Sequence, residues 1–296
     1  MKAFKTLLAS SLILSAVFTG CANSKDSSEI KVGDVTIDLN DVSKEYSMNL
    51  DFGNDYLFET PKPIDTVSVN IPTGNIVIEH SGDDKSGFSL DYKIYGNSED
   101  TIREINEHIH SVSEIKDNTL IIKLVEAQTC EDLEPWLKKN YPDCRVEYDT
   151  YITVPVYVTN YNTVCGVGNI SFVDMAGSFN TDVSVGNITF SGNEITGPST
   201  IKCNTGNIQM NGNVYKAKTD ISAETCNITF CLPLEGSDGA DISVSANTGD
   251  INVTGIKNFE TKEDKKDGLS QKLSINTENC DISFSTVTGK INIEKE

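Results

Sequence analysis

The sequence predicts a mainly β protein, built as a β-solenoid or β-roll of short-strand repeats. A six-residue phrase recurs along the chain: a small residue, Gly, Asn or Asp, Ile, a polar residue and an apolar one. Self-similarity of this kind is typical of repeat proteins, in which each unit packs on its neighbours. The phrases begin at Thr73, Val167, Val185, Thr205, Thr225, Thr248, Asn279 and Thr288, with Cys in place of Gly in the fifth and seventh.

Each repeat is expected to consist of a strand, a turn and a second strand. Gly and Asn tolerate positive φ, and the alternation of Ile, polar and apolar residues that follows is typical of a strand with one buried face. We expect the repeat turns at Gly74, Gly168, Gly186, Gly206, Gly249 and Gly289. The repeat isoleucines are expected to form one buried stack: Ile170, Ile188, Ile208, Ile228, Ile251 and Ile282. A β-sandwich is the alternative, because short strands separated by turns suit it as well.

The N-terminus carries the most specific motif. Lys2 and Lys5 precede an apolar run over residues 7–17, and Gly20 and Cys21 follow in a lipobox-like site. This pattern is typical of a bacterial lipoprotein signal peptide, which predicts cleavage before Cys21 and lipid on its sulfur. The alternative is an ordinary secretory signal. The apolar run is too short for a membrane span, which needs about 20 residues. We therefore expect an exported protein of the cell envelope, anchored to the membrane by lipid.

Changes in composition and residue pattern divide the chain into four parts. Residues 1–20 form the signal peptide, and residues 21–54 begin with small polar residues that favour a flexible tether. Residues 55–158 are expected to form a mixed β cap, and residues 159–296 the repeat domain. A charged stretch over residues 257–268 is expected to be a loop that bulges from one coil.

The cap is predicted to contain one or two short helices. Over residues 99–109, Ile102 and Ile105 have helical spacing, and Ser98 precedes them as a candidate N-cap. Residues 131–140 are the second candidate helix. The segment leading to the repeats, from 145 to 158, alternates strongly, as a strand does.

The chain is acidic, with 44 Asp and Glu against 24 Lys and Arg. Removal of the signal peptide takes away two lysines and changes the net charge from −20 to −22. This charge argues against nucleic acid as a partner and against electrostatic docking on anionic lipid, since both favour clustered Lys and Arg. Membrane contact is thus expected through the N-terminal lipid alone.

The order of these parts resembles the bacterial "putative adhesin" family of β-strand-repeat envelope proteins. The resemblance covers roughly residues 60–293. It is carried by the early phrase at Pro72–Ile76, the helix after Ser98, the strand Asn118–Ile122 and the segment Tyr151–Pro155 before the serial repeats. It implies the repeat fold and a role in adhesion, and it transfers no catalytic or binding residues to this chain.

The eight cysteines have different expected roles. Besides the lipidated Cys21, Cys130 and Cys144 flank a short insertion and are the best disulfide candidates, with two reduced thiols as the alternative. Cys165 and Cys203 have the inward parity of the repeats and are expected in the core. The remaining cysteines lack the spacing of a zinc site, and we expect neither metal nor other cofactor: Cys226, Cys231 and Cys280.

The sequence contains little that indicates an enzyme. It contains no nucleophile elbow, P-loop or HExxH motif, and His108 and His110 are expected to be solvated. Asp182, Asp220 and Asp241 recur before strands, where turn chemistry is the favoured explanation. We expect a non-catalytic envelope protein, adhesin-like or a scaffold or stress-accessory component, with an envelope, carbohydrate or protein partner. The alternative is a carbohydrate-active β-helix enzyme, a polysaccharide lyase or hydrolase that uses these carboxylates.

Overall fold

The chain forms two compact units, Met1–Asp41 and Val42–Glu296. In the first unit, β1 (Glu29–Val32) pairs antiparallel with β2 (Val35–Asp38). The predicted signal peptide and Cys21 lie outside the described residues. The computed structural model describes residues 29–32, 35–38, 42–52, 64–82, 86–231, 237, 239–248, 250–253, 260–267, 270–276 and 280–294.

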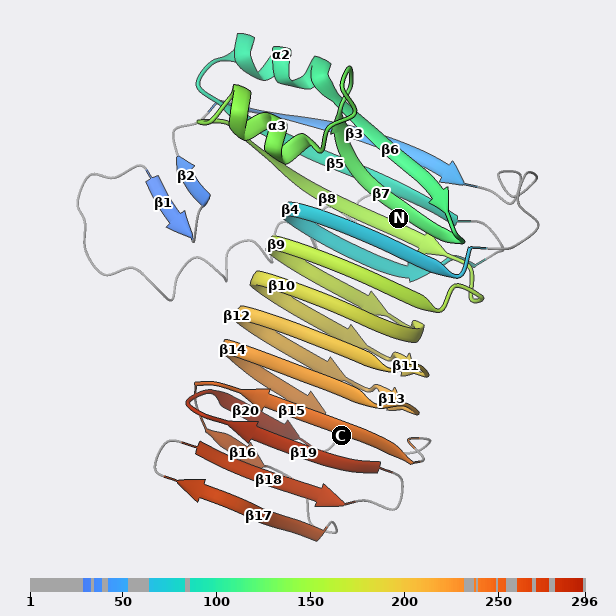
Figure 1. The fold of residues 1–296 in the computed structure, drawn as a ribbon, viewed down its shortest axis with the longest axis vertical. Helices are drawn as coiled ribbons and strands as arrows, with labels where there is room; N and C mark the ends of the chain where they lie inside the picture. Colours follow the sequence, from blue (N-terminus) through green and yellow to red (C-terminus); the bar gives the residue numbers. More distant parts are fainter. Residues whose placement is uncertain are drawn as a thin grey trace. The chain divides into compact units, whose positions relative to one another are not determined.

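The second unit is mainly β, as the sequence predicts, with two short helices and one large mixed sheet (Figure 1). Within the described residues, no helix has the length and apolar character needed to cross a membrane. The N-terminal strands of the second unit pair largely antiparallel: β3 (Val42–Phe52), β5 (Ser86–Gly96), β6 (Ile109–Lys116), β7 (Thr119–Glu126) and β8 (Arg145–Val154).

The two helices lie where the sequence predicts them. Helix α2 spans Glu99–His108, and the Ser98 side chain caps it by accepting a hydrogen bond from the Thr101 backbone N–H. Helix α3 spans Leu133–Asn140 and buries Trp136, together with two leucines. Both helices place apolar side chains in the main hydrophobic core.

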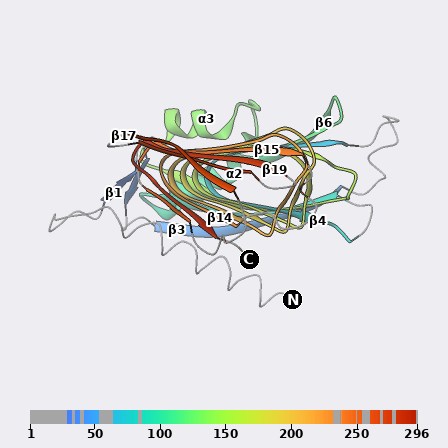
Figure 2. The same ribbon diagram turned by 90° about the horizontal axis from the view of Figure 1, so that it is seen from below.

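The N-terminal antiparallel strands and the two helices form a cap. Below it, five long strands stack in parallel and in register: β4 (Thr66–His80), β9 (Asn160–Val173), β10 (Ala176–Ser191), β12 (Ser199–Asn211) and β14 (Thr219–Cys231). Successive coils are also joined through the short strands β11 (Glu194–Ile195) and β13 (Val214–Tyr215). Viewed along the stack in Figure 2, these coils follow one another around a flattened outline. Every coil thus repeats the same inward and outward positions.

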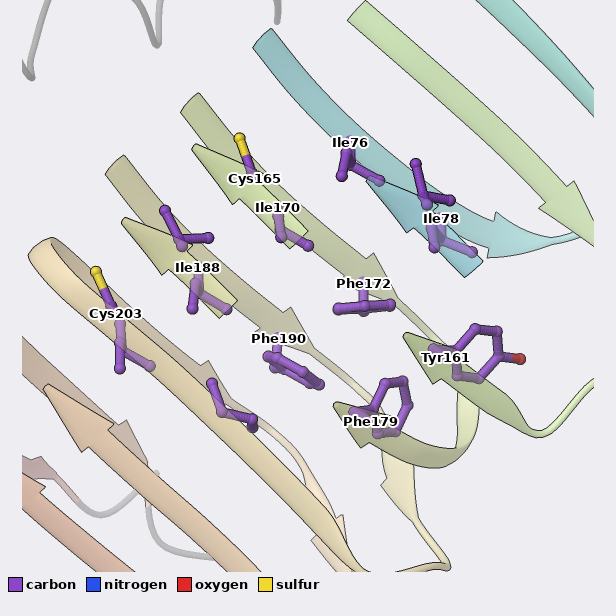
Figure 3. Close-up of a cluster of buried hydrophobic side chains, with 14 of the residues drawn as sticks. Ile76, Ile78, Tyr161, Cys165, Ile170, Phe172, Phe179, Ile188, Phe190 and Cys203 are labelled. Atoms are coloured by element: carbon purple, nitrogen blue, oxygen red, sulfur yellow. The ribbon is translucent and has the colours of Figure 1, made fainter. Parts of the chain in front are cut away.

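The interior of the stack is formed by columns of matched side chains (Figure 3). Ile170, Ile188 and Ile208 lie directly over one another and are at most 1% exposed, and Cys165 and Cys203 are buried in a parallel column, as predicted. An aromatic column runs beside them, in which the ring centroids of Phe172 and Phe190 are 4.8 Å apart. The repeat phrase therefore produces a continuous core.

The C-terminal strands depart from the predicted order: β15 (Ala240–Ala246), β16 (Ile251–Val253), β17 (Glu260–Asp267), β18 (Ser270–Asn276), β19 (Cys280–Thr286) and β20 (Lys290–Glu294). Strand β20 pairs with β14 on one side and β16 on the other, while β15 pairs with β14 and β19. The final strand is thereby inserted between two strands that precede it in sequence.

This order corrects the predicted isoleucine stack. Ile228 is followed by Ile291 and then by Ile251, whereas Ile282 lies beside Ile242 in another column. The phrase at Asn279 resembles the others locally, but its strand pairs with the first half of a coil, so its residues occupy different positions. Register depends on the partner strand, which a local phrase does not specify.

Two regions expected to be irregular contain strands: the predicted tether over residues 21–54 holds β1, β2 and β3, and the charged stretch holds β17. Residues 42–52, within the predicted tether, form β3, which pairs with β5 along its whole length. The alternation of Tyr46, Met48 and Leu50 is the strand signal in this segment. Most of the charged stretch 257–268 forms β17, an edge strand antiparallel to β18. Charged residues are common on edge strands because they oppose pairing with other chains.

Candidate functional site

The bend of the first four coils is set by a column of glycines. Gly74, Gly168, Gly186 and Gly206 have φ between +134° and +149°, a region that L side chains rarely adopt. A Cβ at Gly186 would lie 1.6 Å from the carbonyl oxygen of Gly168, so the row excludes every side chain. Of the other predicted turn glycines, Gly289 has no such φ and Gly249 lies outside the described residues.

A ladder of asparagine side chains follows this bend on the outside of the coils. In each pair the Nδ2 of the lower asparagine donates to the Oδ1 of the one above, over 2.7 Å at the first three steps and 3.3 Å at the last. The ladder is formed by Asn75, Asn169, Asn187, Asn207 and Asn227. These bonds hold the amides in one orientation across five coils.

The two ends of the Asn ladder carry opposite charges. At its donor end, Asn75 Nδ2 donates to the carboxylate of Asp149 over 2.5 Å. At its acceptor end, Lys290 of β20 lies next to Asn227 in register. A carboxylate at the N–H end and an ammonium group at the C=O end both complement the aligned amide dipoles.

Further rows of polar residues line the outside of these strands and continue onto β15, β19 and β20. One row on the first half of the coils consists of Asn180, Thr200, Asp220, Ser243 and Ser283. Its neighbour consists of Asp182, Lys202, Ser222, Ser245 and Ser285. The second half presents Ser171, Thr189, Gln209, Thr229 and Asn292. Adjacent members of a row are spaced by about 4.8 Å, the separation of paired strands.

The three aspartates of the enzyme alternative do not share a row. Asp182 lies beside Lys202, whereas Asp220 is displaced by two residues in register and forms an ion pair with Lys218 over 3.0 Å. Asp241 of β15 lies beside Asp281. All three are exposed or half-buried on the outside of the coils. The aspartates therefore occur as separate parts of a polar surface.

A compact polar cluster in the cap was not foreseen from the sequence. Glu126, 1% exposed at the end of β7, accepts hydrogen bonds from His108 Nδ1 over 2.6 Å, from the Thr129 backbone N–H and hydroxyl, and from the Gln128 N–H. The bond from His108 is the main cause that lowers the pKa of Glu126 to about 2.

The histidine of this cluster is supported on its other side by an aromatic ring. The ring centroids of His108 and Trp136 are 5.0 Å apart, which corrects the expectation that His108 is simply solvated. His110 is exposed, as expected. Glu126 is 18 residues from His108, and no sequence motif links the two; the β6–β7 hairpin brings them together.

The predicted bridge between Cys130 and Cys144 is not formed in the structure, which holds both residues as thiols. Cys130 is exposed in the turn before α3, with φ of +58°. Cys144 is half-buried, with its sulfur beside Gly96. The bridge stays a prediction for the oxidised protein.

The fold and the outward polar rows define a β-strand-repeat protein with an extended polar surface. No protein-family model and no curated protein matches the sequence. Structural comparison finds a putative cell adhesion protein from Clostridium sporogenes, 11% identical, with a TM-score of 0.40, covering 86% of this chain and 100% of that one.

Two further solved structures are similar in outline, each covering 86% of this chain. A putative adhesin from Bacteroides fragilis is 13% identical, with 97% of its chain covered and a TM-score of 0.30. A putative adhesin from Parabacteroides merdae is 8% identical, with 96% covered and a TM-score of 0.33. These scores are too low for any functional inference.

Proposed function

We propose that the protein is a lipid-anchored, non-catalytic component of the bacterial cell envelope that binds its partner through the outer face of a β-solenoid. The observation that carries this proposal is the repetition of polar side chains, in register, across successive parallel coils. Solenoids commonly use such extended faces for binding. The role is adhesin-like, or that of an envelope scaffold or stress-accessory component.

The polar rows suit a partner that is itself extended and rich in hydroxyl or amide groups, such as a polysaccharide or a protein segment. Each coil adds hydroxyl and carboxamide groups at the strand spacing. In the Asn ladder, every internal amide is already held by its neighbours, so little side-chain freedom is lost on binding. Affinity then builds up from many weak contacts.

The same arrangement supports a binding role rather than catalysis. Acid–base catalysis on glycosides needs two carboxyl groups that face one bond from opposite sides. Here Asp182 and Asp220 lie on strands separated by β12, and each has a lysine beside it. Such positions are ordinary for outward charges on a solvated sheet.

Removal of one coil tests the mode of binding. Deletion of residues 169–186 joins Gly168 to Asn187, and these residues already occupy consecutive positions of the repeat. We expect the shortened protein to fold and to bind isolated envelope material less tightly, by a moderate factor. Turnover of an envelope polysaccharide by the intact protein, abolished by Asp182→Asn or Asp220→Asn, would overturn the proposal.

The anchor is tested separately. Cys21→Ala removes the sulfur that the lipid would occupy, and we expect the protein to leave the membrane fraction. Cys21→Ala should leave binding to envelope material by the folded domain unchanged. An unmodified N-terminus elsewhere in the wild-type protein, found by mass spectrometry, would contradict lipidation.

A further inference from the structure

Two buried cysteines of neighbouring coils are in contact with each other where the regular stack ends. Cys203 of β12 and Cys226 of β14 have sulfur atoms 3.0 Å apart, and the residues are 1% and 4% exposed. The sulfurs of a disulfide are separated by about 2.05 Å, so these two sulfurs must approach by about 1 Å to be joined. Beyond β14 the strand order changes, because β20 is inserted between β14 and β16.

Cys226 occupies a position at which the coils above have glycine. Gly206, its partner in β12, has φ of +143°, and a Cβ there would lie 1.6 Å from the Gly186 carbonyl oxygen. Cys226 is not among the described residues with positive φ, so the bend of β14 differs from that of the preceding coils. Its side chain turns into the core toward Cys203, whose register partner in β14 is the small residue Ala223.

We propose that Cys203 and Cys226 form a disulfide in the exported protein, which joins β12 covalently to β14. The bridge fastens the last regular coil to the stack above it. In a repeat protein, stability depends largely on interfaces between neighbouring units, so a covalent link at this interface opposes fraying from the C-terminal end.

The oxidant is a disulfide-bearing donor of the envelope, either a protein or a small molecule. The thiolate of one cysteine attacks one donor sulfur and expels the other as a thiolate, giving a mixed disulfide. The thiolate of the other cysteine then attacks the cysteine sulfur of this mixed disulfide and releases the remaining donor sulfur as a thiolate. Two cysteine thiols lose two electrons and two protons, and the donor disulfide becomes two thiols.

In the folded coils the two sulfurs have different surroundings. The hydrogen bond between the two sulfurs, then those from the backbone of Gly206 and Thr225, lower the pKa of Cys226 despite its burial. The same hydrogen bond, with burial, raises the pKa of Cys203. Both sulfurs are enclosed in the folded coils, so exchange takes place before β14 completes its pairing with β12.

Cys165 provides a matched control within the same column. It occupies the inward position of β9 that corresponds to Cys203, and it is 0% exposed. Its sulfur lies 3.4 Å from the carbonyl oxygen of Gly74, and burial raises its pKa to about 12. Cys165 and Cys203 are thus both buried beside a glycine carbonyl oxygen, and Cys203 differs in also having the sulfur of Cys226 within 3.0 Å.

The bridge is tested by mass spectrometry of the full protein, exported, denatured and alkylated without reductant. We expect a peptide pair linked through Cys203 and Cys226, with both sulfurs protected from alkylation. Cys165→Ser should retain the linked pair. Alkylation of both Cys203 and Cys226 in the exported protein, or linkage of either one to another cysteine, would overturn the proposal.

A thermal measurement gives a second readout. In a Cys130→Ser/Cys144→Ser background, we expect reductant to lower Tm by roughly 5–10 °C, because it opens the loop between Cys203 and Cys226. Cys226→Gly restores the residue that the other coils have, and its Tm should not depend on reductant. An equal Tm of the Cys130→Ser/Cys144→Ser protein with and without reductant would also overturn the proposal.

Discussion

Asp149 accepts a hydrogen bond from Asn75, and this contact sets the direction of every amide in the Asn ladder. A carboxylate only accepts, so Asn75 must turn its Nδ2 toward Asp149 and its Oδ1 toward Asn169. The same orientation then passes to Asn187 and onward to the end of the ladder. One acidic residue in the cap thus orders a row of amides along the coils.

Loss of an internal member of the ladder should be more costly than loss of its end. Asn187 donates to Asn169 and accepts from Asn207, both over 2.7 Å. We expect Asn187→Ala to lower the free energy of unfolding by about 1–2 kcal/mol, because Asn169 Oδ1 and Asn207 Nδ2 each lose one hydrogen bond. Urea denaturation measures this difference.

The matched change is Asn227→Ala. Asn227 is exposed and donates over a longer distance of 3.3 Å, so its loss should change stability by about 0.5 kcal/mol or less. Equal costs at the two positions would show that the ladder does not act as a connected row.

The repeat phrase predicted the parts of the fold that depend on local alternation. The inward positions of Ile208 and Cys203 and the outward position of Gln209 follow from a period of two, which the sequence shows directly. The Ser98 cap was predictable because it is also a local feature, which acts within one turn of helix.

The remaining features depend on which distant strands pair. The phrase containing Ile282 matches the others in its residues, yet β19 pairs with β15 and so belongs to another column. Insertion of β20 beside β14 likewise has no local signal. His108 and Glu126 meet only because a hairpin returns the chain to the end of α2.

The isoleucine column should be sensitive to truncation. Ile208 is fully buried between Ile188 and Ile228, and we expect Ile208→Ala to cost about 2–5 kcal/mol by leaving a cavity between coils. Gln209→Ala, at the exposed neighbouring position, should stay within about 0.5 kcal/mol. Denaturant unfolding of both variants checks the assignment, which fails if the two costs agree.

The glycine column should tolerate no side chain. Gly186→Ala places a Cβ 1.6 Å from the Gly168 oxygen, at a φ of +145°. We expect a loss of about 3 kcal/mol or more, because backbone strain and steric overlap add together. The control is Gly82→Ala, where a Cβ would meet nothing within 4 Å. A thermal shift assay should show a large fall in Tm for the first variant and almost none for the second.

The buried carboxylate of the cap should give stability a specific pH dependence. The pKa of Glu126 is lowered from 4.5 to about 2, first by the hydrogen bond from His108 and also by those from Thr129 and Gln128. A group whose pKa is lower in the folded state contributes stability that is complete above the unfolded pKa. That contribution is lost as the pH falls through the folded pKa. The relevant window therefore lies between about pH 4.5 and pH 2.

Glu126→Gln removes this titration and keeps the size of the side chain. We expect the variant to be less stable than the wild type at pH 6, with the difference shrinking as the pH falls toward 2, in urea unfolding at a series of pH values. Glu131→Gln, at an exposed position in the same turn, should follow the wild-type curve. Parallel curves for wild type and Glu126→Gln over this window would contradict the assignment, because they would mean that the carboxylate has the same pKa in the folded and unfolded chains.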